Sequence, residues 1–119
     1  MKAQRGDIVL VNYPYSDRTG SKTRPCVVVQ NDANNQKLDD TIVVLITSRI
    51  QHVHTERSQV LIDVTTPSGK QTGILFTSAV LCENIATIDC QFLYRKIGVM
   101  PADLMRQIDD ALKAALALP

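Results

Sequence analysis

The chain has 119 residues, the length of one ordinary domain, with 45% hydrophobic and 21% charged residues. This balance excludes an intrinsically disordered chain or a coiled coil, and no apolar run approaches the ~20 residues that cross a bilayer. Thirteen Lys and Arg residues against twelve Asp and Glu residues give a net charge of +1. The overall charge therefore neither requires nor forbids a nucleic-acid partner, and a site for a polyanion must come from local clustering.

The N-terminus and the cysteines indicate the compartment. The first seven residues lead directly into a strand-like pattern without the apolar segment of a secretory signal. The cysteines, Cys26, Cys82 and Cys90, are odd in number and have no C-x-x-C spacing. We therefore expect reduced thiols and a cytoplasmic protein.

Short runs rich in β-branched residues predict strands in the first two thirds of the chain and once more before its end. These runs are 8–11, 26–29, 41–47, 60–62, 73–81 and 92–99. The run 41–47 is apolar on both faces, so we expect it to be central and buried. Polar segments between the runs predict loops or turns at 16–23, 31–35, 51–57 and 66–69, and residues 87–89 predict a short helix or turn.

The period of the apolar residues changes after Pro101. Leu104, Ile108, Leu112 and Leu116 recur at intervals of four, which predicts an amphipathic helix. Pro101 suits the first helical position, and Asp103 suits the positive N-terminal end of a helix. The chain is therefore expected to form one domain, residues 1–119, that is mainly β with twisted antiparallel strands closed by a C-terminal amphipathic helix.

Two places where an apolar strand meets a polar segment are candidate sites. Arg24 stands where a polar loop meets the apolar strand 26–29, a place that can hold a guanidinium fork for bidentate phosphate contact. Thr47, Ser48 and Arg49 directly follow the buried strand, and two hydroxyls beside a cation can bind a phosphate. On the residues alone, a surface arginine paired with a carboxylate and a polar strand end explain the same patterns.

A resemblance across nearly the whole chain favours the phosphate site. Five motifs recur in the same order and at similar spacing in the MazF/PemK/Kid toxin family. They are Arg5-Gly6-Asp7, Gly20-Ser21, Arg24-Pro25 before a valine run, Ile46-Thr47-Ser48, and Glu83-Asn84-Ile85-Ala86-Thr87-Ile88-Asp89. The resemblance implies a small SH3-like barrel. It also implies a homodimeric, metal-independent and cofactor-free endoribonuclease that cleaves single-stranded RNA and is neutralised by a cognate antitoxin of the MazE/PemI type.

The resemblance assigns catalytic positions to this chain. Arg24 matches the catalytic arginine of the family, Thr47 the catalytic threonine or serine, and Glu83 an acidic position, while Ser48 is an adjacent candidate. In metal-free RNA cleavage the ribose 2′-hydroxyl attacks phosphorus and leaves a 2′,3′-cyclic phosphate and a 5′-hydroxyl. Arg24 would stabilise the phosphorane charge and Thr47 would hold a phosphate oxygen. Glu83 would act as the base or orient Arg24.

Further cations and aromatic residues are candidates for RNA contact. The cations are Arg18, Lys22, Arg49 and Arg57, and Tyr13, Tyr15 and Phe76 are able to stack on bases. Because aromatic residues make up only 4% of the chain, core or hinge positions are favoured for them. His52 and His54 compete for acid–base work or a metal pair, but without further nearby ligands a solvated loop is favoured.

Two alternative functions remain open. A protein-binding toxin of the gyrase-poison (CcdB) type would share the fold, but those toxins depend on a C-terminal tryptophan and this chain has no Trp. An inactive RNA-binding relative is the other alternative. The chain departs from the family pattern in its loop Gly20-Ser21-Lys22-Thr23, at Asn84 in place of glutamine and at Ala86 in place of arginine.

An acidic, disordered antitoxin segment would suit the cations named above.

Overall fold

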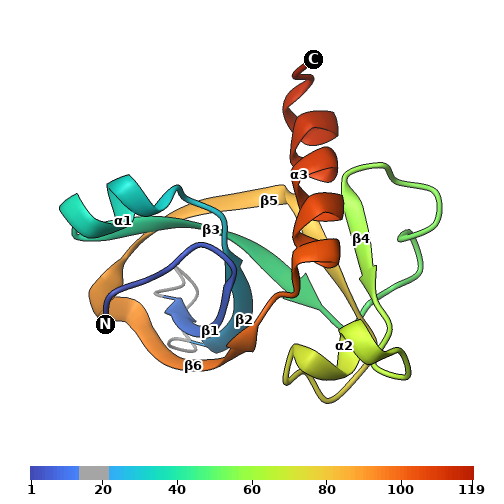
Figure 1. Ribbon diagram of the computed structural model, residues 1–119, viewed down its shortest axis with the longest axis horizontal. Coiled ribbons are helices and arrows are strands. Elements are labelled where there is room, and N and C mark those ends of the chain that lie inside the picture. Colours follow the sequence, from blue (N-terminus) through green and yellow to red (C-terminus); the bar gives the residue numbers. More distant parts are fainter. Residues whose placement is uncertain (14–21) are drawn as a thin grey trace.

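Figure 1 shows the computed structural model of the protein, which describes residues 1–13 and 22–119. Six antiparallel strands form one sheet in the order β4-β5-β3-β2-β1-β6. The strands are β1 (Asp7–Tyr13), β2 (Lys22–Val28), β3 (Asp40–Thr47), β4 (Gln59–Ile62), β5 (Ser78–Asp89) and β6 (Leu93–Val99). The helices are α1 (Asp32–Lys37), α2 (Pro67–Gln71), the 3-10 helix η1 (Cys90–Phe92) and α3 (Ala102–Leu116).

The predicted class, mainly β with a C-terminal amphipathic helix, is confirmed. The sheet is strongly bent at irregularities in register, one of which lies between Val44 and Leu45 of β3. Such bulges bend the strand and increase its twist, so that its two halves run in different directions. Within the described residues, the outer strands β4 and β6 are not hydrogen-bonded to each other, so the sheet curves without closing.

Strand β3 carries the centre of both apolar cores, as its sequence predicts. Val44 and Ile46 lie in one buried cluster, and the neighbouring Val43 lies in the other on the opposite face. The side chain of Val43 and that of Val44 are both inaccessible to solvent. Burying a side chain of this size contributes about 1.5–3 kcal/mol, so β3 is fixed by packing on two sides.

Helix α3 covers one of these cores and lies against β4 and β5 (Figure 1). Of the predicted four-residue series, Leu104 and Ile108 are buried, Leu112 is half-buried and Leu116 is 53% exposed, while Ala111 is buried beside them. Pro101 is the N-cap, one position before its predicted place. The Arg5 guanidinium forms an ion pair with Asp109 and its Nε donates to the Val29 carbonyl, which ties the helix to the end of β2.

Two segments predicted as turns are short helices. The side chain of Asn31 accepts a hydrogen bond from the Asn34 N–H and caps α1, and Thr66 caps α2 in the same way. The residues that cap a helix are the ones that make turns, so their presence alone does not distinguish the two. The loop predicted at 51–57 is confirmed, and the loop predicted at 16–23 lies mostly outside the described residues.

Several strand boundaries also differ from prediction. The strand predicted at 26–29 begins at Lys22, so residues 22 and 23 of the predicted loop, and Arg24 after them, belong to β2. The strand predicted at 73–81 begins only at Ser78, and residues 87–89 continue β5 instead of forming a helix or turn. The side chain of Asp89 caps η1, so the helical signal in that region belongs to the next three residues. No helix among the described residues is long and apolar enough to cross a membrane.

Candidate active site

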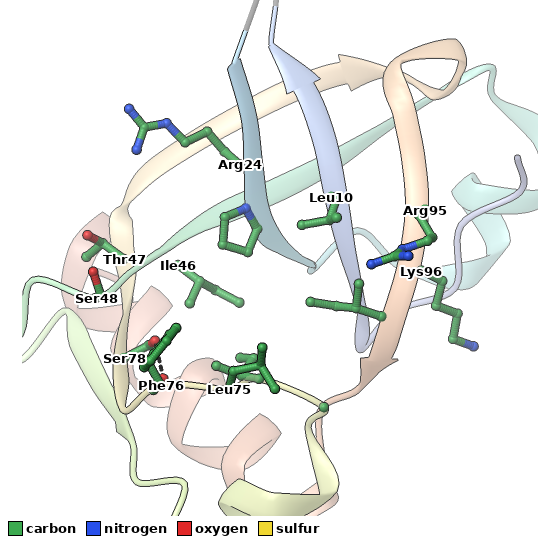
Figure 2. Close-up of a pocket in the computed structure, with 14 residues that line it drawn as sticks. Leu10, Arg24, Ile46, Thr47, Ser48, Leu75, Phe76, Ser78, Arg95 and Lys96 are labelled. Carbon is green, nitrogen blue, oxygen red and sulfur yellow. Dashed lines mark hydrogen bonds between the residues drawn. The ribbon is translucent and has the colours of Figure 1, made fainter.

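A cavity of about 710 Å³ opens where β2 and β3 approach β6 and the segment 73–78 (Figure 2). Its wall includes three of the predicted catalytic residues, Arg24, Thr47 and Ser48. An apolar group, Leu10, Pro25, Ile46, Ile74 and Ile97, forms much of the remaining wall. The cavity therefore places polar, phosphate-binding chemistry beside an apolar surface.

Arg24 is held inside β2, opposite Val11 of β1. The hydrogen-bonded pairing of β2 with β3 begins one residue after Pro25, at Cys26 opposite Leu45. Proline has no N–H to donate, so it suits the position just outside that pairing. If the antiparallel register of β2 and β3 is continued by two residues beyond the Cys26–Leu45 pair, Arg24 lies opposite Thr47, where the two strands are no longer paired. In Figure 2 the guanidinium of half-buried Arg24 extends away from the cavity centre, on the same side as Thr47.

The end of β3 presents two hydroxyl groups. The Oγ1 atom of half-buried Thr47 accepts a hydrogen bond of 3.2 Å from the Arg49 backbone N–H. This contact uses the hydroxyl as an acceptor, so its own proton is directed to a different acceptor. Ser48 is exposed beside it. Both hydroxyl groups therefore lie on the cavity wall.

Glu83 lies apart from these residues. Its two carboxylate oxygens accept hydrogen bonds from the Ser58 hydroxyl and the Gln59 amide, each at 2.9 Å. It lines a second cavity, of about 1020 Å³, together with Arg57 and Lys113, and does not line the cavity of Arg24. The structure thus brings together Arg24, Thr47 and Ser48 but not Glu83, and Glu83 joins the start of β4 to β5.

The remaining predicted RNA contacts are dispersed. Arg49 is exposed directly after Ser48, whereas Arg57 lines the Glu83 cavity. Arg18 and Tyr15 lie outside the described residues, and of Lys22 only the backbone, at the start of β2, is described. His52 and His54 are exposed in the loop after β3, as the solvated-loop interpretation predicts.

Sequence reasoning missed two cations of β6 that line the Arg24 cavity, Arg95 and Lys96. Lys96 Nζ forms an ion pair of 3.1 Å with Asp7, whose side chain is buried. Arg95 lies opposite Leu10, next to the apolar wall, and Figure 2 shows its side chain beside that of Leu10. Adjacent cations in a strand are a detectable signal, but only the sheet order shows that β6 pairs with β1, one strand away from β2.

Of the core or hinge positions favoured for Phe76, the core position is wrong. Its side chain is 72% exposed at the mouth of the cavity, and the neighbouring Leu75 is 83% exposed. Both precede β5 and so fall outside the sheet that buries the apolar residues of the strand itself. An aromatic residue that continues an apolar run, here Ile74 and Leu75, is typical of a core strand, which is why the sequence misled.

The described part of the chain contains a buried thiol, Cys82, beside the helix α3, and no cluster of metal-ligating side chains. Burial, followed by the negative charges of Glu83 and Asp109, raises the pKa of Cys82 to about 12. Cys82 is therefore a neutral thiol at physiological pH and not a nucleophile. Residues 1–13 and 22–119 contain no group of three His, Cys, Asp or Glu side chains placed to hold a metal ion.

Comparisons with known proteins give consistent matches along the chain. Residues 4–116 match the model of a family described as PemK-like, MazF-like toxins of type II toxin–antitoxin systems. The endoribonuclease EndoA of Bacillus subtilis (strain 168) is 34% identical over 119 residues, 99% of this chain and 97% of that protein. A mycobacterial endoribonuclease has a similar structure (TM-score 0.78, 25% identity, 100% of this chain and 95% of that chain). So does a mycobacterial endoribonuclease in complex with its cognate antitoxin (TM-score 0.80, 26% identity, 98% of this chain and 97% of that chain).

Proposed function

The chain belongs to the PemK-like, MazF-like toxins of type II toxin–antitoxin systems, and from this premise we propose that it is a metal-independent endoribonuclease cleaving single-stranded RNA at specific sequences. The observation that carries the proposal is the shared cavity wall of Arg24, Thr47 and Ser48. A cation and two hydroxyl donors along one cavity wall are suited to bind a phosphodiester.

The reaction requires no group beyond RNA and protein. The ribose 2′-oxygen attacks the adjacent phosphorus and loses its proton, the bond from phosphorus to the 5′-oxygen breaks, and that oxygen gains a proton. The products are a 2′,3′-cyclic phosphate and a 5′-hydroxyl. Arg24 stabilises the added negative charge of the phosphorane, while Thr47 and Ser48 hydrogen-bond its nonbridging oxygens. Because Glu83 lies in the neighbouring cavity with both oxygens hydrogen-bonded, we give it a structural role.

The same cations suit an inhibitory partner. A cognate antitoxin with an acidic segment would neutralise Arg24 and Arg95 by lying across the cavity mouth, and so would compete with RNA. We extend the proposal to a homodimer acting in the cytoplasm, in which two such cavities bind one RNA strand. Support for the antitoxin comes from the mycobacterial endoribonuclease that was solved in complex with its own.

The test is cleavage of a long single-stranded RNA by the purified protein in EDTA, followed by sequencing of the new 5′ ends. We expect cuts at a short recurring sequence, with 5′-hydroxyl ends, that are lost in Arg24→Ala and Thr47→Val. Loss of an oxyanion donor typically costs about 100- to 1,000-fold in rate. If the parent cut no faster than Arg24→Ala, the chain would be an RNA-binding or protein-binding relative without catalysis.

A further inference from the structure

Two large apolar side chains stand in solvent at the mouth of the Arg24 cavity. Leu75 and Phe76 are adjacent and are 83% and 72% exposed. Single exposed apolar residues are common, but a pair that continues an apolar cavity wall forms a contiguous patch, and such patches mark binding sites.

Side-chain hydrogen bonds hold the backbone of this segment in place. The Ser78 hydroxyl donates to the Phe76 carbonyl at 2.7 Å, and the Ile74 N–H donates to the Thr72 hydroxyl at 3.1 Å. The Val64 N–H donates to the Thr77 hydroxyl at 3.3 Å. Each of these contacts fixes the backbone while Leu75 and Phe76 point outward. Their exposure is therefore a property of an anchored segment.

Two glycines fix the segment against β6. A Cβ atom at Gly98 would collide with the Thr72 carbonyl, and one at Gly73 would collide with the Ile97 carbonyl. Gly73 also has a φ of +76°, a conformation that other residues adopt only with strain. This close backbone approach keeps Phe76 on the cavity that Ile97 and Arg95 of β6 also line.

The chemistry around Phe76 fits a nucleotide. Among the residues that the structure describes, three cations, Arg24, Arg95 and Lys96, line the cavity, and none of the lining residues is a carboxylate. The apolar wall and the exposed ring offer a face for a base, while the cations and hydroxyls offer contacts for the phosphates on either side of it. Aromatic rings next to cations are the common means of holding single-stranded nucleic acid.

We infer that Phe76 is a positioning residue that stacks on the base adjoining the phosphate held at Arg24 and Thr47, with Leu75 extending the contact surface. This inference rests on the proposed ribonuclease function. It adds to that function a fixed binding position for one base, which determines which phosphodiester bond of the RNA is cleaved. The ring acts by binding and orienting the substrate, so its loss should raise KM more than it lowers kcat.

Fluorescence provides a direct test, because the chain has no tryptophan and Phe76→Trp introduces a single indole. The probe is a single-stranded oligodeoxynucleotide, which the proposed reaction cannot cut because it has no 2′-hydroxyl. We expect saturable quenching of the Phe76→Trp emission. The matched control is Tyr94→Trp, since Tyr94 is 69% exposed on β6 but does not line the cavity. Equal quenching in both variants, or none in Phe76→Trp, would overturn the inference.

Affinity and kinetics give a second measurement. Stacking losses on alanine substitution correspond to about 5- to 150-fold in affinity, and we expect Phe76→Ala to weaken oligonucleotide binding within this range. Phe76→Tyr should retain the affinity and Tyr94→Ala should leave it unchanged. In RNA cleavage, Phe76→Ala should raise KM, and an abasic site at one position of the substrate should remove the difference between Phe76→Ala and the parent.

The outcomes separate this inference from the proposed function. If the parent does not cleave RNA but the quenching and affinity results hold, stacking stands and the ribonuclease assignment fails. If the parent cleaves RNA and Phe76→Ala has the same KM, stacking fails and the assignment stands. If Phe76→Ala changed the oligomeric state of the protein, or weakened the binding of an acidic peptide but not of the oligonucleotide, the patch would be a protein interface and the inference would be overturned.

Discussion

The Thr47 hydroxyl and the Glu83 carboxylate differ in the hydrogen bonds they already make. Thr47 Oγ1 accepts from the Arg49 N–H and keeps its own proton for a further acceptor. Both oxygens of Glu83 accept from side chains of the segment that begins β4. To take a proton from a substrate, Glu83 would have to give up one of these contacts, so the local geometry favours Thr47 for chemistry and Glu83 for structure.

A substitution at Glu83 distinguishes the two roles. A general base contributes about 100- to 10,000-fold to the rate of proton transfer. We expect kcat for Glu83→Gln to fall by far less than 100-fold, and the melting temperature to fall, because the amide satisfies Ser58 and Gln59 less well than a carboxylate. Steady-state RNA cleavage and thermal unfolding measure the two effects.

Glu56→Gln is the matched control, since Glu56 is exposed in the same cavity. It should change neither kcat nor the melting temperature. A 100-fold loss of kcat in Glu83→Gln at unchanged melting temperature would return Glu83 to the catalytic machinery.

At the scale of elements, the contact between α2 and α3 depends on one carboxylate. Asp103, in the first turn of α3, accepts a hydrogen bond of 2.6 Å from the Ser68 hydroxyl of α2. This hydrogen bond, with smaller contributions from the N–H groups of the helix and from Arg106, lowers the pKa of Asp103 below its usual 3.8. The charged form is therefore favoured in the folded state, and its contribution is complete above that usual value and lost as pH falls through the folded pKa.

We expect Asp103→Asn to lower the melting temperature at neutral pH, and the gap from the parent to narrow progressively below about pH 4. Melting curves of both proteins across the acid range measure this difference in melting temperature. Ser68→Ala should reproduce most of the effect, and the double variant should be little worse than either single one because both lose the same contact. A gap that stayed constant down to pH 2 would show that the charge of Asp103 contributes nothing.

The spacing of apolar residues predicted the elements whose position depends on burial of an apolar face. The double-sided apolar run of β3 and the four-residue spacing of α3 correspond to buried faces in the structure. Asn31 and Thr66 were misread because capping and turning use the same side chains, and only the hydrogen bonds from Asn34 and Gly69 reveal the helices.

The site was only half predictable for a different reason. Thr47 and Ser48 lie at the end of a strand that sequence patterns locate, Arg24 lies directly before the predicted strand 26–29, and the family resemblance selected all three. Arg95 and Phe76 belong to the site because β6 and the segment before β5 fold back to it, and that proximity depends on the bulged sheet and on close packing at Gly98. No local pattern carries such long-range information.

For the whole molecule, attraction to RNA must come from the arrangement of charge and not from its sum. The net charge of +1 gives little field at a distance, whereas the cavity gathers Arg24, Arg95 and Lys96. These cations are not equivalent. Lys96 is already paired with Asp7 at 3.1 Å, so an RNA phosphate would have to compete with a buried carboxylate for it. Arg95 is exposed beside the apolar wall.

The salt dependence of binding should therefore be shallow and should depend more on Arg95 than on Lys96. For single strands the slope of log K against log salt is about −0.7 per phosphate neutralised, which predicts about −2 for three cations in each cavity. We expect Arg95→Gln to reduce the slope by about 0.7 and Lys96→Gln to reduce it by less. Titrations of a noncleavable single-stranded oligonucleotide over a range of salt concentrations measure this. Equal changes in the two variants would show that the Asp7 pair opens on binding, and no change in either would place the RNA backbone away from β6.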